Sequence, residues 1–236
     1  METIAELEPT KKKHKLNKVV NRLRKYVDLF DIPESPLGKP VAHSVLLASY
    51  LREALGVDVI PHIRVQDLNK TALLSIIGGL EFIGINKVVL LRGDPVSNDS
   101  TKLTVEEAAF YAKNYYKKLK VGAIVSLRYP TTEILKRVGN RYLDFFLVLR
   151  ASQYEDKLRI IRQHSSTKKI YVYVIIATEK NLPFLREMLN DQPLHILSEV
   201  SSFVDRVRGF ADGVVLSCPF DTDAIVEVSK LVKKLD

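Results

Sequence analysis

Residues 87–95 read Lys-Val-Val-Leu-Leu-Arg-Gly-Asp-Pro, and this stretch decides the fold class of the chain. The apolar run at 88–91 is typical of a strand buried on both faces, as found in parallel sheets. The glycine permits a turn after it, and the final proline cannot continue a β-ladder. Arg92 and Asp94 therefore follow the carboxyl end of an interior strand, where α/β proteins bind ligands. The alternative is an ordinary loop in which Arg92 and Asp94 pair with each other.

Composition sets mild limits on the class of protein. The chain has 236 residues, of which 46% are hydrophobic, enough for one large core. No uninterrupted apolar stretch approaches the roughly 18 residues that span a bilayer, and the amino terminus lacks a signal peptide's basic start and apolar run. Cys218 is the one cysteine, which excludes a disulfide framework and a Cys-x-x-Cys metal site. We therefore expect a cytoplasmic protein.

A basic segment at residues 11–25 carries much of the net charge of +8. Basic patches can bind nucleic acid or polyanionic ligands. In this segment Leu16, Val19, Val20 and Leu23 recur at helical spacing, which favours an amphipathic helix with a solvated basic face. No helix-turn-helix, aromatic RNA-binding or zinc-module pattern accompanies it, so nucleic acid is a disfavoured partner.

Short apolar runs alternate with longer amphipathic segments along the chain. The runs predict strands at 3–7, 27–32, 57–63, 87–91, 122–127, 144–149, 170–176 and 213–216. The amphipathic segments predict helices at 12–25, 41–55, 67–83, 104–119, 131–138, 153–163, 179–190 and 220–235. The seventh crossover is longer and holds an extra segment at 194–200 and a short helix near 203–210.

Eight strand–helix units without a linker rich in Pro, Gly or Ser predict one α/β domain over residues 1–236, a closed (β/α)8 TIM barrel. An open doubly wound sheet is the alternative, but no Gly-x-Gly-x-x-Gly follows the first strand. Asp67 is expected to cap the helix that follows the third strand.

Polar residues gather at the predicted carboxyl ends of the strands, where a barrel places its active site. They are Glu6, Glu8, His62, Arg92, Asp94, Arg128 and Tyr129. A glutamate facing the barrel mouth is a candidate general acid. Each residue also has an ordinary interpretation: a lone histidine at a strand end is more often structural, and Glu8 before a proline can simply be solvated. Because these residues follow different strands but are expected to share one face, a functional role is favoured for them.

Several catalytic patterns are missing from the sequence. There is no nucleophile-elbow sequence, no P-loop, and no cluster of histidine and carboxylate at metal-ligand spacing. A site with scattered polar groups but no nucleophile or metal of its own favours a bound organic cofactor that supplies the chemistry.

Four ordered motifs resemble those of the methylenetetrahydrofolate reductase family. Residues 6–9 (Glu-Leu-Glu-Pro) are similar to its strand-1 motif, and 35–40 (Ser-Pro-Leu-Gly-Lys-Pro) to the following loop of short archaeal-type members. Residues 61–64 (Pro-His-Ile-Arg), with Asp67 three beyond, and 90–95 (Leu-Leu-Arg-Gly-Asp-Pro) resemble the strand-3 and strand-4 motifs. The resemblance covers residues 2–150 well and the remainder in outline.

This resemblance implies a flavoprotein of one-carbon metabolism and methionine biosynthesis, an oxidoreductase. It implies that FAD and a reduced nicotinamide, or another electron donor, reduce a 5,10-methylene-tetrahydropterin to the 5-methyl form. By position, Glu6 is the general acid that protonates the pterin nitrogen, and Asp94 is a catalytic anion near the flavin and the pterin. The implied FAD-binding residues are His62, Arg92, Gly93, Asp94, Arg128, Tyr129 and Lys136, with Lys136 or Arg137 facing the pyrophosphate.

Three family motifs are replaced in this chain. Residues 148–150 (Val-Leu-Arg) replace the usual Thr-Gln, so Leu149 removes the usual pterin contact; residues 175–178 replace a Pro-Gly-Ile-x-Pro loop; and Thr131 and Thr132 replace a Glu and a His. Three explanations follow: a modified tetrahydropterin, an electron-donor protein, or a degenerate barrel paralogue that acts as a binding or partner subunit without reductase activity. The frequent oligomers of the family leave a homo-oligomer open.

Overall fold

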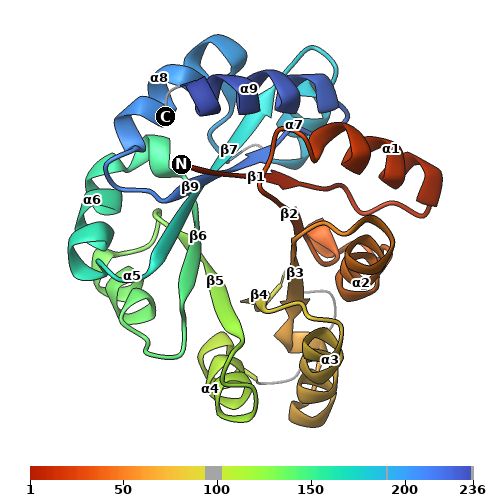
Figure 1. The fold of residues 1–236 in the computed structure, drawn as a ribbon. Coiled ribbons are helices and arrows are strands. Elements are labelled where there is room, and N and C mark those ends of the chain that lie inside the picture. Colours follow the sequence, from red (N-terminus) through yellow and green to blue (C-terminus); the bar gives the residue numbers. More distant parts are fainter. Residues whose placement is uncertain (94–102, 190, 235–236) are drawn as a thin grey trace.

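The computed structural model describes residues 1–93, 103–189 and 191–234. In these ranges eight parallel strands close into a barrel with helices outside it (Figure 1). The barrel strands are β1 (Glu2–Glu6), β2 (Leu29–Ile32), β3 (Val59–Arg64), β4 (Lys87–Leu91), β5 (Lys120–Ser126), β6 (Phe145–Leu149), β7 (Lys169–Ala177) and β9 (Gly213–Ser217). Because β9 pairs with both β7 and β1, and β6 pairs with β7, the sheet has no open edge. The predicted (β/α)8 barrel is confirmed.

One face of each strand fills the barrel interior. Ile4, for example, lies opposite Leu29 on β2 and Val215 on β9. At the amino end the ring of Phe145 packs edge-on against a tyrosine of β7, and Gly122 leaves room for it, because a Cβ at that position would lie 2.3 Å from the ring. The interior is therefore a packed core, and ligands must approach the side chains at the carboxyl ends of the strands.

The helices cover the outside of the barrel and form a second core against the strands. They are α1 (Lys13–Leu23), α2 (Ser44–Leu55), α3 (Lys70–Phe82), α4 (Val105–Tyr115), α5 (Thr131–Val138), α6 (Glu155–His164), α7 (Leu182–Met188), α8 (Leu197–Val207) and α9 (Thr222–Lys234). Short 3-10 turns occupy Pro36–Gly38, Val65–Asp67 and Ala151–Gln153. None of the helices in the described ranges is long and apolar enough to cross a membrane.

Helix α1 contains the basic segment of the sequence. Leu16, Val20 and Leu23 are buried, whereas most lysines and arginines of residues 11–25 are exposed. The helix is therefore amphipathic, as its apolar spacing predicts.

Two local predictions were wrong. Asp67 does not cap α3; its carboxylate lies 2.8 Å from Nε of Arg64, and Asn69 accepts the capping hydrogen bond from the backbone of Ala72. The extra segment after α7 contains a two-residue strand, β8 (His195–Ile196), which pairs in parallel with the carboxyl end of β7. Helix α8 starts directly after it at Leu197, because Val200, Phe203 and Val207 share a buried face that begins before the predicted start.

Candidate functional site

A cluster of five polar side chains lies at the carboxyl end of the barrel interior. Each is two residues beyond a side chain of the packed interior, so strand alternation points it inward. The cluster consists of Glu6 on β1, Asp31 on β2, His62 on β3, Tyr173 on β7 and Ser217 on β9.

Hydrogen bonds join these five side chains into one network, which we call the mouth cluster. Tyr173 Oη lies 2.9 Å from Glu6 Oε2 and 2.7 Å from Asp31 Oδ2. Ser217 Oγ donates to Glu6 Oε1 at 2.5 Å, and His62 Nε2 lies 2.7 Å from Asp31 Oδ1. Two carboxyl groups, a phenol and an imidazole therefore share one hydrogen-bonded site.

Burial and neighbouring charges shift the ionisation of the mouth cluster. Burial of its carboxyl group raises the pKa of Glu6, and the Asp31 carboxylate raises it further. Burial alone would lower the pKa of His62, but Asp31 and Glu6 outweigh it, and the pKa of His62 is raised. Burial, then Asp31 and Glu6, hold the pKa of Tyr173 well above its usual range. The arrangement favours a neutral, proton-donating Glu6 that keeps some accessible surface.

The loop after β2 fixes the backbone beneath His62. Ser44 Oγ donates to the carbonyl oxygen of His62 at 2.5 Å, and the backbone N–H of Ser44 donates to Glu34 Oε2 at 2.6 Å. The start of α2 is thereby tied to β3 and to the loop. These contacts hold the His62 backbone in place, and the imidazole itself is held by Asp31.

The end of β4 brings the predicted residues Arg92 and Gly93 to the same face as the mouth cluster. Arg92 is exposed. Gly93 has φ +90°, and a Cβ there would lie 2.7 Å from Nε of Arg64, so both the backbone conformation and the close approach require glycine. Asp94, the second predicted catalytic residue, lies outside the described residues.

The ends of β5 and β6 carry a second charged group. Arg128 and Tyr129, both predicted, are exposed, and Arg128 pairs with Asp191 at 3.0 Å. Arg150, which sequence reasoning did not select for a role, is 6% exposed, has φ +66° and pairs with the same carboxylate at 2.6 Å. Asp191 therefore neutralises two arginines beside the barrel mouth.

The predicted phosphate-binding pair on α5 lies apart from these residues. Lys136 is exposed in the last turn of the helix. Arg137 donates to Glu106 at 2.9 Å and to the carbonyl oxygen of Ile124 at 3.2 Å, which ties α5 to α4 and β5. The structure gives Arg137 a structural partner, and the role of Lys136 stays a prediction.

Other chemistry finds little support in the described ranges. No group of three or more His, Cys, Asp or Glu residues there could hold a metal ion. Burial raises the pKa of the Cys218 thiol to about 12, so this cysteine is not activated as a nucleophile. The buried hydroxyl of Ser126, at the end of β5, has no hydrogen-bond partner, and it is a donor that a ligand could use.

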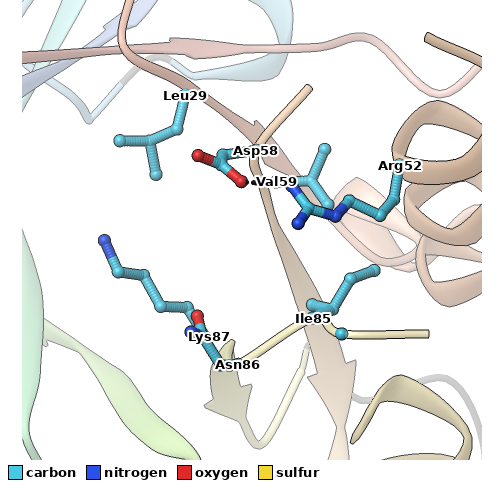
Figure 2. A pocket seen from close by; sticks show the side chains of 8 residues that line it. Leu29, Arg52, Asp58, Val59, Ile85, Asn86 and Lys87 are labelled. Carbon is cyan, nitrogen blue, oxygen red and sulfur yellow. Dashed lines mark hydrogen bonds and ion pairs between the residues drawn. The ribbon is translucent and has the colours of Figure 1, made fainter. Parts of the chain in front are cut away.

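Two cavities lie at opposite ends of the barrel. A pocket of about 230 Å³ is lined by residues such as Leu29, Asp58 and Lys87 at the amino ends of the strands, where Asp58 pairs with Arg52 (Figure 2). A pocket of about 850 Å³ lies past the carboxyl end of β7, beside α7 and the start of α8. It is lined by Ala177, Thr178, Glu179, Lys180, Leu182, Arg186, Leu194, Ile196, Leu197, Ser198 and Asp221. Of these two pockets, the larger opens on the face where barrels bind substrates.

Sequence reasoning missed Asp31, Tyr173 and Ser217. One signal was present for Asp31: a charged residue inside a strand whose neighbours are all apolar. Such a residue points into the barrel and requires a buried partner. Tyr173 gave no comparable signal, because tyrosines are common in strands.

Comparisons with known proteins identify a family and a shared fold. The family model described as methylenetetrahydrofolate reductase matches residues 4–134, which run from within β1 through β5. A search of curated proteins found no match.

Similar solved structures share the fold. A protein from Clostridium thermocellum that binds two copies of 5-methyl-5,6,7,8-tetrahydrofolic acid superposes with TM-score 0.68 at 11% identity, over 99% of this chain and 94% of that one. A mutant tryptophan synthase α-subunit from Pyrococcus furiosus superposes with TM-score 0.60 at 11% identity, over 99% of this chain and 97% of that one. At such identity these likenesses concern the barrel alone. The family model spans more than half of the chain, and the chain belongs to the methylenetetrahydrofolate reductase family.

Proposed function

We propose that this protein reduces a 5,10-methylene-tetrahydropterin, a folate or a modified pterin, to its 5-methyl form with bound FAD. The observation that carries the proposal is Glu6: a partly buried residue whose carboxyl has a raised pKa, at the carboxyl end of β1, in a member of this family. The neighbour from Clostridium thermocellum that binds 5-methyl-5,6,7,8-tetrahydrofolic acid lends support to a reduced pterin as ligand.

The chain's own residues have distinct tasks in this reaction. Glu6 donates its proton to the pterin nitrogen: its O–H bond breaks, an N–H bond forms, and the methylene bridge opens to an electrophilic iminium. FAD bound at this site would, once reduced by a nicotinamide or another donor, supply the hydride that completes the methyl group. The hydrogen bond between His62 and Asp31 keeps the ionisation of these two side chains constant while Glu6 donates its proton.

Among the groups at the barrel mouth, the residues at the end of β4 are the best candidates for contacts with a flavin. Arg92 is exposed and has no hydrogen bond or ion pair with the described residues, and the absent side chain of Gly93 allows a close backbone approach. The unpartnered Ser126 hydroxyl adds a donor on the neighbouring strand. Arg128 already has Asp191 as partner, so its contribution to FAD binding requires that this pair open.

Flavin binding is tested first, by the absorbance spectrum of the purified protein before and after FAD is added, followed by bleaching with dithionite. A flavin band near ~450 nm is expected. Arg92→Ala is expected to weaken FAD binding about ten- to hundredfold, as for loss of a hydrogen bond to a charged group. Arg141→Ala, an exposed arginine before β6 at the opposite end of the barrel, serves as the matched control and keeps the affinity. A colourless protein that ignores FAD overturns the proposal.

The acid is tested by Glu6→Gln, which is expected to slow methylene reduction by about 10²–10⁴. Glu2→Gln is the matched control, since Glu2 also accepts a hydrogen bond from a tyrosine of β7, Tyr171 at 3.0 Å, but at the amino end of the same strand. Equal rates for Glu6→Gln and the wild type would remove Glu6 from the mechanism.

A second function, reversible binding of a reduced pterin without reduction, is favoured by the ends of β6 and β7. Leu149 stands where the family usually places a pterin-binding Gln, and Arg150 beside it is held by Asp191. Binding of 5-methyl-tetrahydrofolate by a colourless protein, measured by calorimetry, would support this function over the reductase.

A further inference from the structure

The hydroxyl of Tyr173 contacts two carboxyl groups. Its oxygen lies 2.9 Å from Glu6 Oε2 and 2.7 Å from Asp31 Oδ2, both hydrogen-bond distances. A phenol carries one hydrogen and can donate only one hydrogen bond. In the other contact the tyrosine oxygen must accept, and the hydrogen must come from the carboxyl group. One of the two carboxyls is therefore a protonated acid.

The remaining contacts identify Glu6 as the protonated carboxyl. Asp31 Oδ1 faces Nε2 of His62, which donates to it as a cation or as the Nε2–H tautomer. Both side chains are almost fully buried, at 0% and 3% exposure, and His62 supplies the Asp31 carboxylate with a hydrogen-bond donor in either form. Oε1 of Glu6 accepts from Ser217, which leaves its Oε2 to carry the hydrogen toward Tyr173. The direction of donation runs from Glu6 to Tyr173 to Asp31.

We propose that Tyr173 is a positioning residue that accepts the hydrogen of the neutral acid Glu6 and turns its own hydrogen from Asp31 to Glu6 when Glu6 gives up its proton. The role in turnover rests on the proposed reductase function; the protonation state rests on the geometry alone. The O–H bond of Glu6 breaks and the N–H bond of the pterin forms, while the O–H bond of Tyr173 rotates and stays intact. The new Glu6 carboxylate then accepts from Ser217 and Tyr173, and Asp31 keeps His62.

The other buried charged groups beside the mouth cluster in the ranges described have partners of their own: Arg64, two positions beyond His62 on β3, pairs with Asp67 at 2.8 Å. Besides the five side chains of the mouth cluster, Glu34 acts on His62 from the loop after β2. The inward side chains of β4 and β5 that pack at this depth, Leu91 and Ile124, are apolar. A proton leaving Glu6 is therefore compensated within the cluster itself.

Infrared spectroscopy of the flavin-free protein at neutral pH tests whether the Glu6 carboxyl is protonated. The wild-type minus Glu6→Gln difference spectrum is expected to contain the carbonyl stretch of a protonated carboxyl. Tyr173→Phe is expected to shift that band, and Ser217→Ala to move it to higher frequency because Oε1 loses its donor. Tyr171, two positions before Tyr173 on β7, and Glu2, four positions before Glu6 on β1, supply the controls: Tyr171→Phe and Glu2→Gln leave the band unchanged. An absent band, or one indifferent to both Tyr173→Phe and Ser217→Ala, overturns the inference.

The role in turnover is tested by the pH profile of methylene reduction in Tyr173→Phe. Without the donor to its carboxylate, Glu6 is a weaker acid, so kcat falls about tenfold or more and the alkaline limb of the profile moves to higher pH. A merely structural Tyr173 would move neither the infrared band nor the limb. If the band behaves as expected but the protein neither binds FAD nor turns over, the proposed function fails, whereas the protonated state of Glu6 is supported. If FAD binds and the wild type turns over but the limb does not move, the role of Tyr173 fails alone.

Discussion

Nε2 of His62 lies 2.7 Å from Oδ1 of Asp31, and the two side chains are 3% and 0% exposed. A buried pair of this kind is costly to break, because removal of one partner leaves the other without compensation. The acid Glu6 and the loop carboxylate Glu34 both act on His62, so the charge of the pair affects both the stability and the chemistry of the barrel mouth.

Asp31→Asn is expected to lower the free energy of unfolding by about 3–5 kcal/mol and to lower the pKa of His62, since Asp31 is the main attraction that raises it. Urea unfolding and a histidine NMR titration measure the two effects. Asp58→Asn breaks the exposed Arg52–Asp58 pair at 2.6 Å and is expected to cost less than about 1 kcal/mol. Similar losses for the two variants would contradict a buried ion pair.

The stability of the protein is expected to fall as pH rises above the ordinary glutamate pKa of about 4.3. The pKa of Glu6 is raised in the folded state, so between its unfolded and folded values the folded chain binds more protons than the unfolded chain. His62, also raised, acts with the same sign above about 6.5. Urea unfolding across this pH range is expected to show a shallower decline in Glu6→Gln, and a decline of unchanged slope would contradict the raised pKa.

Gly122→Ala is expected to destabilise the protein by about 1–3 kcal/mol, the usual range for overpacking. Its Cβ would lie 2.3 Å from the ring of Phe145, inside a filled barrel. Gly79→Ala is the control: Gly79 lies within α3, no atom lies within 4 Å of the Cβ, and the helix should gain about 0.5–1 kcal/mol. Thermal unfolding of both variants distinguishes steric overlap from backbone propensity, and a tolerated Gly122→Ala would mean that the interior is loosely packed.

Gly93→Ala is expected to weaken FAD binding, because its Cβ would displace Arg64 at the end of β4. Gly84→Ala shares the positive φ but has nothing within 4 Å of its Cβ, so it bears only the backbone strain of about 1–2 kcal/mol. Flavin titrations, with unfolding curves for both variants, separate the two effects. Equal FAD affinities would place Gly93 outside the flavin site.

The sequence by itself determined the barrel and part of the site. Alternating apolar runs and amphipathic segments predict eight parallel strands, and short polar endings such as Glu6 and His62 identify the functional face, because alternation and strand direction are local properties. The shared face of these two residues follows from topology alone.

Only the tertiary structure decided which groups meet. Tyr173 is 142 positions from Asp31 in the chain, and Arg150 is 41 from Asp191. Their contacts depend on closure of the barrel through β7 and β9 and on the register of parallel strands, which packing of the whole interior sets. The sequence could place an acid at the barrel mouth, but the hydrogen-bond network that sets its protonation exists only once distant strands are adjacent, because hydrogen bonds act over about 3 Å.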